Sequence, residues 1–295
     1  MKVSLIVGTT GRRCEQIGRL LESIAGQTHR DIEVVIVIQG SHEIDEVVGP
    51  FRSSVDVRVE RIQRYGLSHA RNVGSRIACG EILAFPDDDC FYGVDTVGAA
   101  VQRLVECNRD VVVGSIHDPC SLAPFFRYPG ECISMKRRQL WLAPSIAIFI
   151  RAHSFERVRG FDEDFGLGAC YPSAEETDLL VRVAACSPVG SVVFDPMIRV
   201  YHRKQGKCKS DLFYERRERA YGMNRGWGAL IRKHLRRDYV YWLGMLWVLL
   251  ARRFSGMVYH GILKGDSHAL RYYAGSCRAL ITGFMGYRPA DGRRV

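Results

Sequence analysis

Three consecutive aspartates, Asp87 to Asp89, directly follow a short apolar run at 82–85. Such a run is typical of a buried strand, and Pro86 ends it because proline cannot donate a hydrogen bond to a sheet. Carboxylates this close together repel one another, so the triplet predicts a bound cation. A hard divalent ion, Mn²⁺ or Mg²⁺, shared with substrate phosphates is the simplest candidate. The alternative is a solvated acidic turn.

Strand-like and helix-like segments alternate along the first 200 residues. Buried-strand runs at 3–7 and 32–38 enclose a segment, 17–24, in which apolar residues recur with helical spacing. Strands at 55–62 and 82–85 flank a second helical segment in the same way. This order predicts an α/β fold with a mostly parallel sheet flanked by helices. Ligands bind such sheets at the carboxyl ends of the strands, where the aspartates stand.

Charge is distributed unevenly along the chain. Residues 201–295 carry 20 Lys and Arg against 6 Asp and Glu, whereas the first 200 residues carry 22 against 26. We therefore expect one domain at 1–205 and a basic, mainly α-helical region at 206–295. Such a region indicates an anionic partner: a membrane surface, nucleic acid or a phosphorylated substrate. Scattered cysteines without a Cys-x-x-Cys pair, and no signal peptide ahead of the first strand, favour a cytoplasmic protein.

The most apolar run of the chain spans 239–251 and contains two tryptophans. It is shorter than the roughly 20 residues that a membrane-spanning helix needs. Arginine pairs at 236–237 and 252–253 bracket it, a pattern typical of a helix that lies in a membrane interface. The alternative is a buried helix that packs on the main domain.

Five segments, in the same order and spacing, resemble motifs of the family 2 inverting glycosyltransferases with the GT-A fold. They are the first strand and its loop at 3–13, Ser23 to Thr28 (Ser-x-x-x-Gln-Thr), Gly66 to Gly74 (Gly-x-Ser-x-Ala-Arg-Asn-x-Gly), Phe85 to Asp89 (with Asp-x-Asp), and Gly160 to Asp162 followed by Glu175 to Leu179. The resemblance covers about residues 3–205. It implies a Rossmann-like sheet, a nucleotide-sugar donor, a saccharide acceptor and a divalent metal.

The basic region also resembles known proteins, but over a shorter segment. Its segment Tyr221-Gly222-x-x-Arg225-Gly226 is similar to that of a bacterial subgroup thought to make surface polysaccharides. This implies a lipid-linked saccharide acceptor and an enzyme held peripherally on the inner face of the membrane, near anionic headgroups.

The resemblance also implies roles for the aspartates. Asp89 would ligate the Mn²⁺ or Mg²⁺ directly, Asp87 would hold the ribose or a metal-bound water, and Asp88 would be a spacer or share that work. His202, at a strand end, would complete the metal shell or contact phosphate, although a lone histidine is often structural.

Further residues are candidates for contacts with the nucleotide sugar and the acceptor. Thr9 and Arg12 lie in the first loop, and Arg71 is either a nucleotide contact or an exposed helix arginine. Ile38 stands where the family has an Asp that reads uracil, so the donor base stays open. Gln39 offers both a donor and an acceptor to another base. Trp141 would stack on the acceptor sugar or be a core tryptophan.

Glu176 stands where the family has its catalytic Asp, which implies that it takes the proton of the acceptor hydroxyl. Its neighbour Glu175 points about 100° away on a helix. Because a helix N-terminus stabilises negative charge, we expect Glu176 to be ionised at neutral pH. The alternative is that both are simply acidic first-turn residues.

Two other functions are compatible with parts of the sequence. A nucleotidyltransferase on a similar sheet also needs metal-binding carboxylates but has no use for a base at Glu176. A nucleic-acid-binding protein fits the basic region but leaves the aspartates unexplained, and the chain has no zinc motif or recognisable recognition helix. We therefore expect no nucleic-acid partner.

Overall fold

The computed structural model describes residues 1–203 and 212–288. Contacts within the chain define two compact units, which are treated separately below. The first comprises Met1–Glu163 and Glu175–Gln205, and the second comprises Asp164–Ala174 and Gly206–Val295. The segment 164–174 therefore belongs to the second unit although it lies between two parts of the first in sequence.

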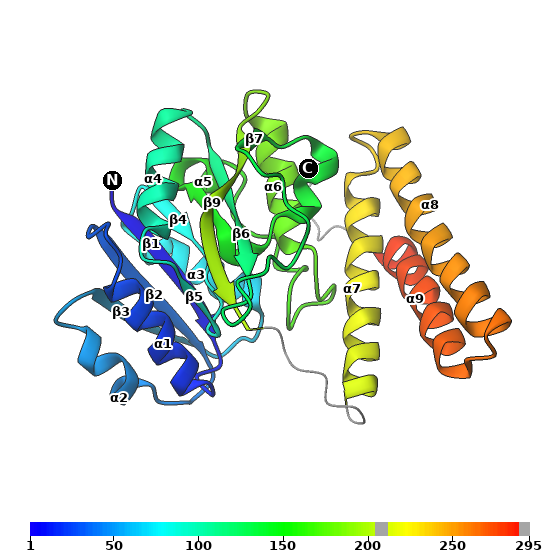
Figure 1. Cartoon of the computed structure of the whole chain (residues 1–295), viewed down its shortest axis with the longest axis horizontal. Coiled ribbons are helices and arrows are strands. Elements are labelled where there is room, and N and C mark those ends of the chain that lie inside the picture. Colours follow the sequence, from blue (N-terminus) through cyan, green and yellow to red (C-terminus); the bar gives the residue numbers. More distant parts are fainter. Residues whose placement is uncertain (204–211, 289–295) are drawn as a thin grey trace. The chain divides into compact units, whose positions relative to one another are not determined.

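A nine-stranded mixed sheet, counted over the described residues, is the centre of the first unit (Figure 1). Its order in space is β3 (Asp56–Ile62), β2 (Ile32–Gln39), β1 (Val3–Thr9), β4 (Ile82–Ala84), β8 (Ile148–Arg151), β6 (Val111–His117), β9 (Val192–His202) and β5 (Cys90–Tyr92), with β7 (Ile133–Ser134) paired to β9. The strands from β3 to β4 are parallel, as are β6 and β9. In contrast, β8, β5 and β7 run antiparallel to their neighbours.

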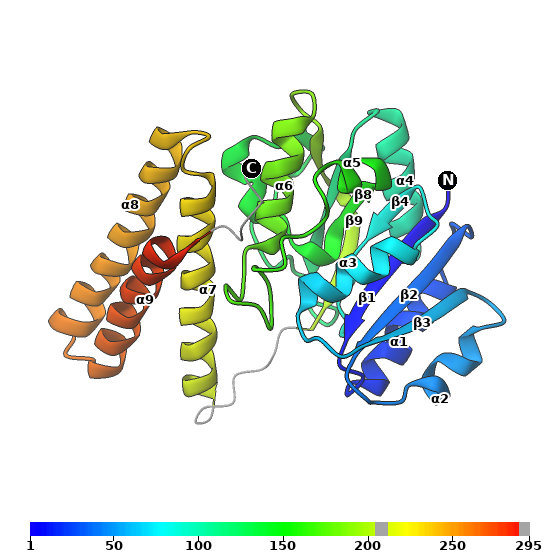
Figure 2. The same ribbon diagram turned by 180° about the vertical axis from the view of Figure 1, so that it is seen from behind.

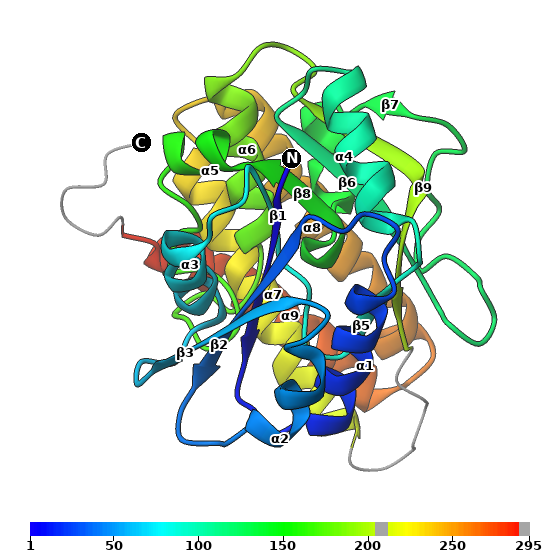
Figure 3. The ribbon, with the colours of Figure 1, turned by 90° about the vertical axis from the view of Figure 1, so that its left-hand side faces the viewer.

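Helices cover both faces of this sheet (Figure 3). One face carries α1 (Cys14–Ala25), α2 (Asp45–Val48) and α4 (Thr96–Glu106), and the opposite face carries α3 (Leu67–Ile77), α5 (Ala152–Arg157) and α6 (Glu175–Cys186), seen from behind in Figure 2. Short helical turns η1 (Gly49–Phe51), η2 (Arg137–Leu142) and η3 (Ser145–Ala147) complete the unit. The predicted α/β class is therefore confirmed.

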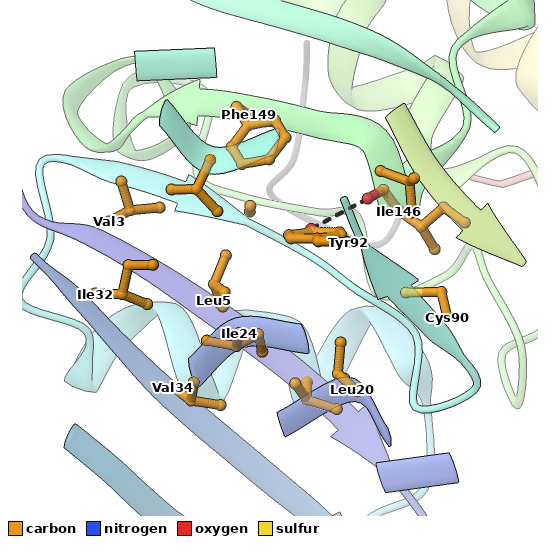
Figure 4. Close-up of a cluster of buried hydrophobic side chains, with 14 of the residues drawn as sticks. Val3, Leu5, Leu20, Ile24, Ile32, Val34, Cys90, Tyr92, Ile146 and Phe149 are labelled. Atoms are coloured by element: carbon orange, nitrogen blue, oxygen red, sulfur yellow. Dashed lines mark hydrogen bonds between the residues drawn. The ribbon is translucent and has the colours of Figure 1, made fainter. Parts of the chain in front are cut away.

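The hydrophobic core lies between the sheet and α1 (Figure 4). Leu20 and Ile24, one helical turn apart, are buried against inward-facing strand residues such as Leu5. The Tyr92 hydroxyl reaches the Ile146 carbonyl at 3.2 Å, which satisfies its polar group inside the core. Each fully buried aliphatic side chain contributes about 1.5–3 kcal/mol.

The Ser-x-x-x-Gln-Thr motif serves packing in this structure. Gln27 is fully buried, and its Nε2 donates to the carbonyls of Ser23 at 2.9 Å and Gly93 at 2.8 Å. Its Oε1 accepts from the Val97 amide at 3.0 Å. One side chain thus ties the end of α1 to the start of α4, because a buried amide must satisfy both its donors and its acceptor.

The second unit is helical, as predicted for the C-terminal region. It contains α7 (Leu212–His234), α8 (Tyr239–Gly256), the π-helical continuation η4 (Met257–Leu263) and α9 (Ser267–Gly286). Glycines let α7 and α9 approach closely, since a Cβ on Gly283 would collide with the Arg225 carbonyl. The segment 164–174 packs on these helices, where Tyr171 Oη donates to the Gly286 carbonyl at 3.0 Å. None of the described helices is long and apolar enough to cross a bilayer.

Strand β9 is continuous from Val192 to His202, and its pairing with β6 shifts register between Val113 and Ser115. The apolar run 239–251 does form a helix, but of the α8 residues only Trp242 is buried. Trp247, in the same run, is 70 % exposed, so the run is not a core helix.

Candidate active site

The three aspartates follow β4 and are held by cations and hydroxyls from other elements. Asp88 accepts hydrogen bonds from Thr9 Oγ1 at 2.6 Å and from Arg13 Nη1 at 3.0 Å. Asp89 accepts from the same Arg13 nitrogen at 2.6 Å, and Asp87 accepts from Arg71 Nη2 at 2.9 Å. The alternative of a solvated acidic turn is therefore wrong.

The pairing of β5 with β9 brings His202 to the aspartates. Cys90 lies opposite His202 in the ladder, and His202 Nε2 is 3.2 Å from Asp89 Oδ1. This hydrogen bond lowers the pKa of Asp89 below its usual value and raises the pKa of His202. A carboxylate and an imidazole thus lie in direct contact, and their role as metal ligands stays a prediction.

The residues present fit a divalent cation only in part. Within 1–203 and 212–288, no group of three His, Cys, Asp or Glu side chains is arranged to hold a metal. Asp87 accepts a hydrogen bond from Arg71. Of the candidate metal ligands, Asp89 and His202 are therefore the two that lie next to each other. Mn²⁺ and Mg²⁺ are usually bound by one or two protein carboxylates together with substrate phosphates, and Asp89 with His202 fits that incomplete set.

Arg13 is a site residue that the sequence interpretation missed. Its side chain is 49 % exposed, and its guanidinium bridges Asp88 and Asp89. The neighbouring Arg12, which the sequence favoured, is exposed. The sequence shows two adjacent arginines just before α1, but it does not reveal which of them faces the aspartates.

Arg71 connects the aspartates to the start of α6. It is fully buried, with Nη2 also donating to Ser145 Oγ at 3.2 Å and Nη1 lying 3.5 Å from Glu175 Oε1. Its guanidinium also stacks over the Phe161 ring at 5.4 Å. The alternative of an exposed helix arginine is therefore wrong.

Glu176 follows Glu175 at the N-terminus of α6. Burial, followed by the charge of Glu175, raises the pKa of Glu176 well above its ordinary value of 4.5. The backbone N–H at the helix start and the charge of Arg71 oppose this rise but are outweighed. The helix N-terminus was expected to favour the ionised form of Glu176, and in this structure burial outweighs that effect on its pKa. A raised pKa suits a carboxylate that must accept a proton near neutral pH.

The three remaining candidates, Thr9, Gln39 and Trp141, lie in different elements of the first unit. Thr9 is buried, and besides its bond to Asp88 it accepts from the Gly11 amide at 3.0 Å. Gln39 is buried, and its Oε1 accepts from the Gly66 amide at 2.7 Å, so its acceptor is used to hold the start of α3. Trp141 lies in η2 and is 46 % exposed, so it is not a core tryptophan.

Known glycosyltransferases resemble this chain in sequence. The family model described as Glycosyl transferase family 2 matches residues 4–165. An uncharacterized glycosyltransferase of Haemophilus influenzae is 38% identical over 192 residues, which are 61% of this chain and 61% of the relative. The chain spans 14% to 61% of the length of three curated relatives.

Solved structures share the fold. The mannosyltransferase PcManGT from Pyrobaculum calidifontis, in complex with GDP-Man and Mn²⁺, has a TM-score of 0.60 at 18% identity, covering 97% of this chain and 88% of that chain. S. aureus TarS 1-349, in complex with UDP, has a TM-score of 0.58 at 18% identity, covering 100% of this chain and 93% of that chain. At these identities the likeness shows the fold alone.

Proposed function

This chain belongs to glycosyl transferase family 2, and we propose that it is a metal-dependent inverting enzyme that moves a sugar from a nucleotide-sugar donor to a saccharide acceptor. The family and its relatives make the chain a glycosyltransferase. The proposal adds the metal, the stereochemical course, the donor class and the acceptor class.

One observation carries the proposal: the buried Arg71 contacts both Asp87 and the Glu175–Glu176 helix start. Transfer with inversion needs a site for the donor diphosphate and, on the opposite side of the reacting carbon, a carboxylate that takes a proton. Arg71 fixes the aspartates and the start of α6 relative to each other within the first unit. A nucleotidyltransferase needs the aspartates but not the second carboxylate.

Each group then has a role in the reaction. The acceptor oxygen forms a bond to the sugar carbon, the bond from that carbon to the donor phosphate breaks, and Glu176 takes the hydroxyl proton. Asp89 and His202 would hold the Mn²⁺ or Mg²⁺. When bound, the ion neutralises the charge of the diphosphate leaving group. Asp87, Asp88 and Thr9 line the donor side, where Arg71 adds a fixed positive charge.

The donor is proposed as a class, because the base is not specified by the residues present. PcManGT was solved with GDP-Man and TarS with UDP, so proteins of this fold hold different nucleotides. Ile38 is fully buried and offers no side-chain hydrogen bond, and the Gln39 acceptor is occupied by Gly66. Arg12 and the remaining Gln39 amide donor stay candidates for contacts with the nucleotide, and Trp141 for stacking on the acceptor.

We further propose a lipid-linked acceptor in polysaccharide assembly and a peripheral position on the inner face of the membrane. The support is an exposed apolar stripe on α8, in which Val240 is 81 % and Trp247 is 70 % exposed. Arg236 and Arg237 precede it. Apolar and aromatic residues next to arginines are typical of helices that bind anionic bilayer surfaces. Equal flotation with anionic and neutral liposomes would contradict this part.

The experiment that tests the reaction begins with a thermal-shift panel of nucleotides and nucleotide sugars, with and without Mn²⁺, because a bound ligand raises the apparent stability. The nucleotide sugar that binds is then used to measure transfer by wild type, Glu176→Gln and the control Glu156→Gln, whose residue is exposed on α5. We expect Glu176→Gln to keep donor binding and to lose transfer by about 10²–10⁴-fold. Unchanged turnover would favour a nucleotidyltransferase.

A further inference from the structure

A pocket of ≈ 620 Å³ lies within the second unit, between α7 and α9. Its walls include Tyr221, Gly222 and Arg225 from α7 and Gly275 and Arg278 from α9. Three of these residues belong to the Tyr221-Gly222-x-x-Arg225-Gly226 segment that the sequence singled out. The proposed reaction assigns this segment no role.

The glycines of this segment let the neighbouring loop approach α7 closely. A Cβ on Gly222 would come within 2.8 Å of Pro172, and one on Gly226 within 2.9 Å of the Ser173 carbonyl oxygen. The Ser173 hydroxyl in turn donates to the Met223 carbonyl at 3.0 Å. Loop 164–174 therefore forms one wall of the pocket because α7 has no side chain in the way.

Two guanidinium groups make the pocket basic. Arg225 donates to the Cys170 carbonyl and lies 5.8 Å over the Tyr171 ring, so its charge is held in place. Arg278 comes from α9 and is exposed. One carboxylate, the exposed Glu218, also lines the pocket, which leaves an excess of positive charge.

We propose that this pocket binds the phosphate or diphosphate group of a phosphate-linked acceptor saccharide. This rests on the proposed function and adds a binding site for the phosphate of its lipid-linked acceptor. Guanidinium groups bind phosphate oxygens through paired, charge-assisted hydrogen bonds. Glycine, alanine, proline, threonine and tyrosine line the rest, and the volume exceeds what a phosphate fills, so carbon-bearing groups attached to the phosphate have room.

The test measures binding of inorganic pyrophosphate and of farnesyl diphosphate to the whole protein by calorimetry, in EDTA so that no metal-dependent donor site contributes. Arg278→Gln and Arg225→Gln are compared with Arg219→Gln, which removes the same charge from the exposed face of α7 outside the pocket. We expect each pocket variant to weaken both ligands about tenfold, since one charge-assisted interaction is lost, and the control to bind as wild type does. Because Arg278 is exposed, its replacement leaves the fold intact.

Two further measurements distinguish a phosphate-linked acceptor from other anions that the pocket could bind. Glucuronate, a carboxylated sugar, should not compete with pyrophosphate, and phosphatidylglycerol vesicles should bind wild type and Arg278→Gln equally. Loss of vesicle binding with unchanged pyrophosphate binding would overturn the proposal in favour of a lipid headgroup. Equal pyrophosphate affinity in all proteins would also overturn it. Neither binding measurement involves sugar transfer or the Glu176→Gln variant. A failure of the proposed reaction can therefore be told apart from a failure of the pocket proposal.

Discussion

Arg13 Nη1 donates to Asp89 Oδ2 at 2.6 Å, so a cation of the protein itself neutralises the carboxylate proposed to ligate the metal. The same nitrogen lies 3.0 Å from Asp88 Oδ1. Close carboxylates need a positive charge, and here an arginine supplies it. A divalent ion bound by Asp89 would therefore compete with Arg13 for these oxygens.

From this competition we predict that Arg13→Ala binds Mn²⁺ several-fold more tightly than wild type. An ion entering the wild-type site must first displace the guanidinium, whereas the variant leaves the carboxylates free and mutually repelling. Electron paramagnetic resonance of free Mn²⁺ measures the affinity directly. Arg12→Ala is the matched control, because it removes an equal charge one residue away without touching the aspartates. Equal affinity in wild type and both variants would show that Arg13 does not compete.

A second prediction concerns the buried cation between the aspartates and α6. Arg71→Met should lower the free energy of unfolding by about 3 kcal/mol, because it leaves the buried carboxylate of Glu175 and the partly exposed one of Asp87 without their positive partner. The exposed Arg76, on the same helix, provides the control Arg76→Met, which should stay within about 0.5 kcal/mol. Urea unfolding measures both. If Arg71→Met lost no more free energy of unfolding than Arg76→Met, water or rearranged side chains would take over the contacts of Arg71.

The raised pKa of Glu176 gives a pH prediction. The base must be ionised, so transfer should fall as the pH drops through the raised pKa, well above the ordinary 4.5. Glu175→Gln removes the like charge that contributes to the rise, so the acidic limb of the kcat profile should move to lower pH. Glu156→Gln should leave the limb where it is. An acidic limb that stays fixed in Glu175→Gln would show that the neighbouring charge does not act on the base.

The same group affects stability with a definite sign. Because the folded pKa lies above the unfolded value, the folded state holds a proton that the unfolded state has already released. This contribution is present at low pH and is lost as the pH rises from about the ordinary value through the raised one. Glu176→Gln removes the titration, so its free energy of unfolding should depend less on pH across that window.

The sequence predicted the sheet but not every contact within the site. Buried runs such as 3–7 and 32–38 specify strands, because continuous apolar runs of that length fit a sheet covered on both faces. The burial of Arg71 was not predictable, because its partners Asp87 and Glu175 lie 16 and 104 positions along the chain and meet only after the strands pair. The pKa of Glu176 was misjudged for the same reason: helix position is local, whereas burial depends on distant segments.

The last prediction concerns the helix contact behind the pocket. Gly283 lies against the backbone of Arg225, where a Cβ would collide with the carbonyl oxygen and come within 2.8 Å of the carbonyl carbon. Backbone atoms cannot rotate away, so Gly283→Ala must push α9 from α7 and should cost about 1–3 kcal/mol. Gly286→Ala is the control on the same helix, because nothing lies within 4 Å of a Cβ there. Alanine is the better helix former, so the control should be neutral or slightly stabilising in thermal unfolding. Because the displaced backbone carries Arg225, Gly283→Ala should also weaken pyrophosphate binding, and intact stability together with intact binding would show that the two helices do not depend on this contact.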